Sequence, residues 1–179
     1  MPLAHGGPLR LIVPGYSGVN NIKYIKRLAF TKEQTQAAIQ KTGYRISPVG
    51  EKGDPSQPSV WLMDAKSWVT SPSPDNGPVK AGALQITGVA MGGLEDVAKV
   101  DVSLDGGKTW QAARLVGPDL GKYAWRQFVL ATNLKAGQYD VSCRVTTKSG
   151  VEQVAQSTEN TGGYLNSGWV AHTVKINVV

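Results

Sequence analysis

The sequence predicts a mostly β protein, in which an immunoglobulin-like β-sandwich follows a short α+β segment. Twenty-one glycines and ten prolines are spread along the 179 residues without a fixed period, which indicates frequent turns between short strands. From residue 60 onward, alternating apolar and polar runs recur without an intervening helical pattern, as is typical of sandwiches. The 41% of hydrophobic residues is enough to form a sizeable core.

The N-terminal part is expected to contain two strands and a helix. Residues 9–13 are an apolar run ended by a Pro-Gly pair, which predicts a buried strand and a turn. Residues 22–30 interleave apolar and polar positions imperfectly, and we predict a second strand there. Thr31 is followed three residues later by Gln34, which is a capping-box pattern, so a short helix is expected over residues 32–41.

A linker is expected over residues 47–59, because this stretch carries three prolines and two glycines and no regular periodicity. We therefore divide the chain into residues 1–55 and residues 56–179. The strands predicted after the linker span residues 60–63, 66–70, 82–90, 98–104, 109–115, 124–130, 139–147, 151–156 and 171–178.

The clearest hairpin lies at residues 100–110. Val100, Val102 and Leu104 alternate with polar residues, and the Asp-Gly-Gly sequence at 105–107 tolerates the positive φ angles of a tight turn. No helix follows these glycines to receive an anion, so they do not form a phosphate-binding loop. The hairpin is a structural signal without chemistry of its own.

Charge and composition exclude several classes of partner. The formal charge of +6 comes from scattered lysines and arginines rather than a basic tract, so no nucleic-acid partner is expected. No apolar run approaches the roughly 20 residues of a membrane span. The first residues have neither the basic start nor the apolar core of a signal peptide.

The sequence predicts no metal site within this chain. Cys143, the single cysteine, excludes an internal disulfide framework and a multi-cysteine zinc site, and we interpret it as a buried structural thiol on an alternating strand. His5 and His172 are too far apart to define a metal site, and His172 is interpreted as a strand-face residue. Three tryptophans are expected to pack in the core or an interface: Trp110, Trp125 and Trp169.

Three basic side chains surround the first predicted strand and the turn and loop that follow it. Proteins present groups to a phosphate or an anionic cofactor in this way, so His5, Arg10 and Lys23 are candidate binding residues. From spacing alone, ordinary surface charge is the simpler interpretation, and both remain open.

Residues 5–24 resemble the closing segment of the molybdopterin domain in the sulfite oxidase family. The family pattern there is a histidine, an arginine five residues on, a Val-Pro-Gly turn, and a lysine thirteen residues after the arginine. All four features are present. The resemblance implies that His5, Arg10 and Lys23 contact the pterin and its phosphate. It also implies that Tyr44 matches the active-site tyrosine beside the metal; from its position alone, Tyr44 would be a packing residue in the turn after the predicted helix.

The downstream half resembles the dimerisation domain of the same family. The resemblance implies that residues 1–55 are the tail of a molybdopterin-binding domain and that residues 56–179 form an immunoglobulin-like dimerisation domain. Four stretches match in order and spacing: residues 100–110, 124–126, 165–169 and 174–178.

The chain departs from the family pattern in two respects. The family's molybdenum-ligating cysteine lies in an earlier part of its cofactor domain, and Cys143 matches a strand cysteine of the dimerisation domain instead. We therefore expect that the metal ligand comes from a part absent from this chain, and that the chain alone is inactive. Members acting on sulfite often carry a substrate-binding arginine where Gly162 stands in this chain, so the substrate stays open.

The resemblance implies that the chain is the C-terminal part of a molybdenum oxidoreductase. Such an enzyme transfers an oxygen atom to sulfite or a related sulfur oxyanion and passes electrons to a cytochrome, for which a c-type cytochrome is the candidate. The expected partners are a catalytic molybdopterin domain, in the same parent chain or as a separate subunit, and a second copy bound through residues 56–179. The location would be periplasmic in a bacterium. The alternative is a non-catalytic immunoglobulin-like module that dimerises or docks a redox partner.

Overall fold

The computed structural model describes residues 1–179, and the contacts within it divide the chain into two compact units. The first unit comprises Met1–Met63 and Thr158–Leu165, and the second comprises Asp64–Ser157 and Asn166–Val179. Residues 158–165 therefore pack with the N-terminal unit although they interrupt the sequence of the second. The domain boundary placed at residue 55 stays a prediction.

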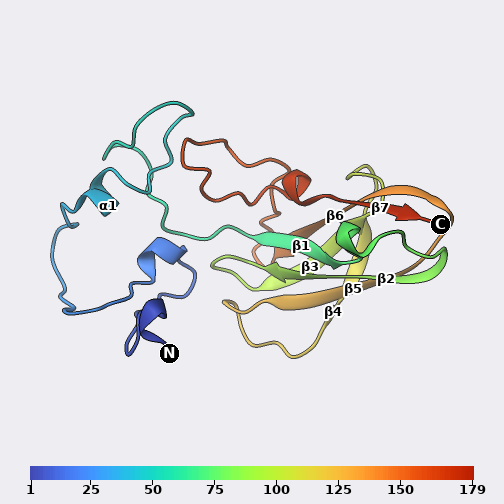
Figure 1. Cartoon of the computed structure of the whole chain (residues 1–179), viewed down its shortest axis with the longest axis horizontal. Helices are drawn as coiled ribbons and strands as arrows, with labels where there is room; N and C mark the ends of the chain where they lie inside the picture. Colours follow the sequence, from blue (N-terminus) through green and yellow to red (C-terminus); the bar gives the residue numbers. More distant parts are fainter. The chain divides into compact units, whose positions relative to one another are not determined.

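The second unit is a mostly β structure with one antiparallel sheet, whose strands run in the order β1-β2-β5-β4-β3-β6-β7 (Figure 1). Strand β1 also packs against β6, so the sheet curls until it nearly closes. This confirms the predicted immunoglobulin-like sandwich. The strands are β1 (Lys66–Ser71), β2 (Gly82–Met91), β3 (Val97–Ser103), β4 (Gln111–Val116), β5 (Arg126–Leu134), β6 (Gly137–Thr147) and β7 (Val174–Val178).

The core lies between the inner faces of these strands. It forms because alternate residues of each strand point to the same face, so the apolar members of the predicted runs meet. Burial of each such side chain contributes about 1.5–3 kcal/mol. The largest apolar side chains without solvent exposure are Ile86, Val100, Val102, Phe128, Val141 and Val145.

The predicted hairpin joins β3 and β4. Val100 lies opposite Ala113, as in the expected antiparallel register, and the turn glycines have positive φ angles. The Asp105 carboxylate accepts hydrogen bonds from the Thr109 hydroxyl at 2.6 Å, the Thr109 amide at 2.9 Å and the Lys108 amide at 3.0 Å. Together with the Ser103 hydroxyl, the Thr109 donors hold the pKa of Asp105 well below its usual range.

A segment before β2 covers the outer edge of β7. The Val79 amide donates to the Asn177 carbonyl at 2.8 Å, and the Ala81 amide donates to the Val179 carbonyl at 2.7 Å. The Val179 amide in turn donates to the Val79 carbonyl at 2.8 Å. Because these groups are paired, this end of the edge strand offers few free backbone groups to another chain.

The N-terminal unit is irregular, and the two strands predicted in it are wrong. Only one residue of each, Arg10 and Lys23, pairs with the other in an isolated bridge. The ladder does not extend because the Val13 amide donates to the Asn21 side chain at 2.8 Å, and because Tyr24 has a φ of 58°, which turns the chain out of an extended path. A side chain thus accepts the backbone hydrogen bond that a neighbouring strand would otherwise accept.

The predicted helix over residues 32–41 is also wrong in extent, since only α1 (Ala38–Lys41) forms. The Thr31 hydroxyl donates to the Glu33 carbonyl at 2.7 Å, so no capping box is made. Residues 31–39 are exposed, and a short helix without a buried face is marginal. The remaining helical elements are single 3-10 turns at Leu3–His5, Gly18–Asn20, Pro74–Asn76 and Trp169–His172.

Three further strand predictions need correction. Residues 60–63 and 151–156 make only single bridges, through Leu62 and Glu152. The last strand begins at Val174 rather than at residue 171, because a 3-10 turn occupies Trp169–His172. His172 is therefore a turn residue, and the strand-face interpretation was wrong.

Two other interpretations agree with the structure, the first of them in part. Residues 47–59 form no regular strand or helix, as the turn residues predicted, but they belong to the first unit, which extends to Met63, and so do not form the expected linker. Cys143 lies on β6 in the core, where burial raises the pKa of its thiol to about 12.

Two of the tryptophans, Trp110 and Trp169, meet edge to face with ring centroids 5.1 Å apart. Trp125 packs on Trp68 at 4.7 Å.

Candidate functional site

In the first unit, the backbone of Lys23 lies next to Arg10 and next to Gly6, the residue that follows His5. The Arg10–Lys23 bridge is supported by a hydrogen bond from the Leu11 amide to the Ile22 carbonyl at 2.9 Å. His5 ends the 3-10 turn Leu3–His5 that precedes this bridge.

Close backbone packing holds the His5 turn against Lys23. A Cβ atom at Gly6 would lie 2.2 Å from the Lys23 Cβ, so only glycine fits at this position, which also has a φ of +95°. The Tyr24 hydroxyl donates to the Ala4 carbonyl at 3.0 Å and ties the same two segments together. The residues that flank His5 and Lys23 therefore fix the distance between their backbones.

The three basic side chains have no acidic partner in the chain. None of them is among the residues that form ion pairs within 4.0 Å, which involve other lysines and arginines. The Nε atom of Arg10 is buried and has no hydrogen-bond partner. A buried donor without a partner is costly, and an anionic acceptor satisfies it best. The site is therefore suited to a negatively charged group.

A groove of about 360 Å³ opens beside this site. Its walls combine apolar side chains with two further cations, which is compatible with a flat, partly charged ligand. The lining residues are Leu11, Ile22, Tyr24, Ile25, Lys26, Arg27 and Leu28.

Tyr44 lies elsewhere in the same unit, and no hydrogen bond joins it to His5, Arg10 or Lys23. Its backbone has a φ of 47°, and its carbonyl accepts a hydrogen bond from the Val60 amide at 2.8 Å. The next residue, Arg45, is buried, and its guanidinium donates to the Gln57 carbonyl at 2.9 Å and the Gln40 carbonyl at 2.6 Å. These contacts anchor the Tyr44 backbone.

The Tyr44 ring is 37% exposed and stacks on Tyr164, with ring centroids 5.1 Å apart and an angle of 27° between the planes. The sequence reasoning missed Tyr164. The only signal that could have found it is its place two residues after Gly162, a position that the resemblance had already singled out.

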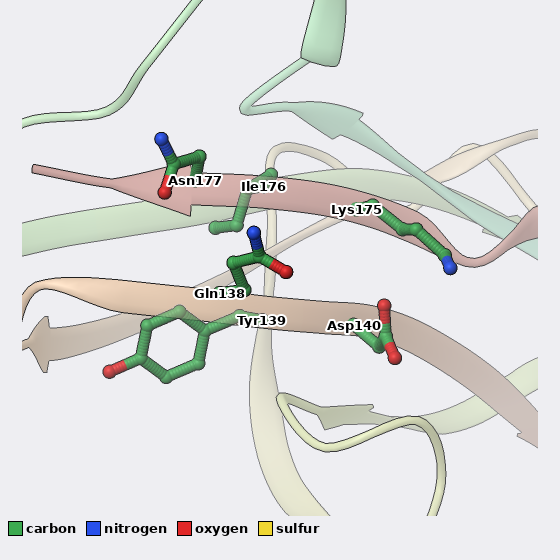
Figure 2. Close-up of a pocket in the computed structure, with 6 residues that line it drawn as sticks. All are labelled: Gln138, Tyr139, Asp140, Lys175, Ile176 and Asn177. Atoms are coloured by element: carbon green, nitrogen blue, oxygen red, sulfur yellow. The ribbon is translucent and has the colours of Figure 1, made fainter.

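A second groove, also of about 360 Å³, lies along β6 and β7 in the second unit. Figure 2 shows Gln138 and Asp140 on β6 with Lys175 and Asn177 on β7 along it. Asp140 and Lys175 are register partners but do not form an ion pair within 4.0 Å. The groove contains no nucleophile or paired acid and base that would suggest catalysis.

No group of three or more histidine, cysteine, aspartate or glutamate side chains is placed to hold a metal ion. None of the helices has the length and apolar character needed to cross a membrane.

Two domain families match the chain. Residues 57–179 match the Mo-co oxidoreductase dimerisation domain, and residues 1–39 match the oxidoreductase molybdopterin binding domain. The first match covers most of the chain and the whole sandwich.

The relatives include enzymes of several kinds. Mitochondrial sulfite oxidase of Homo sapiens is 33% identical over 99% of this chain, and sulfite oxidase of Gallus gallus is 32% identical over 83% of it. A nitrate reductase of Solanum lycopersicum is 27% identical over 97% of the chain. The chain spans only 34%, 34% and 21% of these three relatives, respectively.

A solved structure shares the fold and much of the sequence. In the crystal structure of the sulfane dehydrogenase SoxCD from Paracoccus pantotrophus, one chain superposes with a TM-score of 0.78 and 32% identity, over 98% of this chain and 47% of that one. The chain belongs to the sulfite oxidase family of molybdenum-cofactor oxidoreductases, of which it carries the dimerisation domain together with a stretch of the molybdopterin-binding domain.

Proposed function

We propose that the chain is the C-terminal part of a sulfite-oxidase-type enzyme and supplies dimerisation, pterin contacts and part of the substrate pocket. The observation that supports the pterin contacts is the buried Nε of Arg10, which lacks a hydrogen-bond partner, together with Lys23, which makes no ion pair. The donor set suits the phosphate of molybdopterin, because charge-assisted hydrogen bonds from arginine and lysine are the usual means of holding phosphate.

His5, Arg10 and Lys23 would hold the cofactor, with the two longer side chains neutralising its phosphate. When bound, the molybdenum cofactor supplies oxygen-atom transfer with a two-electron change. Tyr44 would place its hydroxyl toward an oxyanion substrate, donate a hydrogen bond and relay a proton. The sulfite oxidase relatives support sulfite or a related sulfur oxyanion as substrate. The resemblance implies a cytochrome as electron acceptor and, in a bacterium, a periplasmic location.

The test separates cofactor occupancy from turnover in the enzyme formed with the cofactor-bearing part of its parent protein. Arg10→Gln and Lys23→Gln should each weaken cofactor binding, because a charge-assisted contact worth about 1.5–3 kcal/mol is lost. Turnover per bound molybdenum should change less. Lys32→Gln is the matched control, since Lys32 is exposed and makes no ion pair, and its occupancy should equal that of the wild type.

Tyr44→Phe should have the opposite effect, leaving occupancy near normal and reducing turnover, since it removes one hydroxyl and no group that holds the pterin. Molybdenum content and steady-state rate measured on the same preparation decide the matter. Normal occupancy in both Arg10→Gln and Lys23→Gln would remove the basis for the proposed contacts, and an empty site in Tyr44→Phe would exclude a purely catalytic role.

A second candidate function is a non-catalytic dimerisation or docking module. The observation that favours it is that the second unit contains a nearly closed sheet and its own core, without help from the first. Light scattering and co-purification separate the two functions. A dimer that never associates with a cofactor domain supports the module, whereas a dimer that carries the cofactor domain supports the enzyme.

A further inference from the structure

Hydrogen bonds from Thr161 hold the segment Thr158–Leu165 to the rest of the first unit. The Thr161 amide donates to the Ser47 carbonyl at 3.0 Å, and the Thr161 hydroxyl donates to the Pro48 carbonyl at 2.6 Å. Asn160 then clamps Tyr164, because its side chain accepts from the Tyr164 amide and donates to the Tyr164 carbonyl, both at 2.9 Å. These hydrogen bonds fix the backbone of Tyr164 independently of the contacts that its ring makes.

The Tyr164 ring stacks on the Tyr44 ring. The hydroxyl of Tyr44 makes no hydrogen bond to the protein, so no polar contact fixes where the ring points. The stacked geometry, with centroids 5.1 Å apart, lies within the range in which aromatic pairs attract each other. The Tyr44 backbone is held by its hydrogen bond from the Val60 amide, and the stack on Tyr164 is the aromatic contact of its ring.

Gly162 makes room for this arrangement. A Cβ atom at Gly162 would lie 2.2 Å from Cε2 and 2.5 Å from Cζ of the Tyr164 ring. Any side chain at position 162 therefore pushes the Tyr164 ring aside, and an arginine there is incompatible with the observed stack. The segment also contains no lysine or arginine, so it brings no positive charge to the Tyr44 ring.

We propose that Tyr164 is a positioning residue for Tyr44, and that Gly162 is the residue that permits it. This inference rests on the proposed function, in which Tyr44 faces the substrate. A tyrosine ring, and no positively charged side chain of the segment 158–165, thus lies beside Tyr44. Any negative charge on the substrate must be met by groups other than this segment.

The first test is spectroscopic and needs no turnover. In the full chain with carbon-13-labelled tyrosine rings, the Tyr44 signal is assigned from its loss in Tyr44→Phe. Tyr164→Ala and Gly162→Ala should both shift the Tyr44 ring signal, because the ring current of Tyr164 is lost or displaced. Tyr164→Phe retains a ring and should shift the signal far less. Tyr123→Ala is the control, since Tyr123 is an exposed tyrosine that belongs to the second unit.

The second test is kinetic and uses the enzyme with its cofactor-bearing part. Tyr164→Ala should lower turnover per bound molybdenum by about two- to tenfold, the range expected for loss of one aromatic pair, while Tyr164→Phe stays near the wild type. In a Tyr44→Phe background, Tyr164→Ala should have no further effect, since no hydroxyl is left to position.

The possible results separate this inference from the proposed function. If Tyr44→Phe lowers turnover but Tyr164→Ala lowers it equally in both backgrounds, the positioning role is overturned and the proposed function stands. If Tyr44→Phe leaves turnover unchanged, the proposed role of Tyr44 fails and this inference fails with it. A Tyr44 ring signal that is the same in Tyr164→Ala, Gly162→Ala and the wild type overturns the positioning role on structural grounds.

Discussion

Gly88 in β2 lies where a methyl group cannot be accommodated. A Cβ atom there would be 2.2 Å from Cζ of Phe128 and 2.4 Å from the carbonyl oxygen of Trp68. Phe128 has no solvent exposure and is enclosed by the core, and the Trp68 carbonyl belongs to the backbone of β1. Neither atom can retreat without moving a neighbouring strand or side chain.

Gly88→Ala should therefore destabilise the sandwich. Reduced freedom of the unfolded chain favours alanine by about 0.4–1 kcal/mol, whereas overpacking of a core costs typically about 1–3 kcal/mol. The steric cost exceeds the gain, because both close contacts are more than 1 Å inside ordinary van der Waals distance. The central values leave a net cost of about 1.3 kcal/mol. With a slope of roughly 2 kcal/mol per molar urea, we expect the unfolding midpoint to fall by about 0.6 M.

Urea unfolding followed by tryptophan fluorescence measures this midpoint. The control is Gly18→Ala, since nothing lies within 4 Å of a Cβ atom at Gly18 and the midpoint should not fall. Phe128→Leu shortens the side chain that is in the way, so Gly88→Ala should cost less in that background than in the wild type. An unchanged or raised midpoint in Gly88→Ala would refute the steric argument.

Two further predictions concern titrating groups in the sandwich. Asp105→Asn should lower the free energy of unfolding at pH 7, because folding lowers the pKa of Asp105 and so favours its charged form. The difference between the two proteins should persist above about pH 4 and shrink as the pH falls further. Acid titrations of the wild type and the variant measure it. Cys143, whose thiol pKa is raised to about 12, should react with an aromatic disulfide at pH 8 only as fast as the chain opens, and rapid labelling of the folded chain would contradict its burial.

The sandwich could be predicted from the sequence because burial on one face dictates its pattern. Val100 and Val102 alternate with polar residues, and the same alternation around Cys143 places all three in one core. The exceptions are short runs in which local hydrogen bonds compete with pairing. At the last strand, for example, a 3-10 turn at Trp169–His172 takes residues that the pattern assigned to β7.

The N-terminal unit could not be predicted in the same way, because side chains replace strands there. The Asn21 side chain accepts a hydrogen bond from the Val13 amide and donates to the carbonyls of Tyr16 and Ser17. Such contacts leave no periodic pattern in the sequence from which they could be predicted. The three basic residues were identified by resemblance, and their roles stay predictions. Tyr164 was not identified, since its partner Tyr44 is far away along the chain.

The segment Thr158–Leu165 has a consequence for how such enzymes diversify. It falls within the sequence matched by the dimerisation domain, yet it packs with Tyr44, Ser47 and Pro48 of the first unit. Exchange of the two domains between homologous genes at their sequence boundary would therefore transfer Gly162 and Tyr164 with the sandwich and leave Tyr44 behind. In a hybrid enzyme of this kind, Tyr44 would come from one parent, and the tyrosine ring that stacks on it would come from the parent that supplied the dimerisation domain.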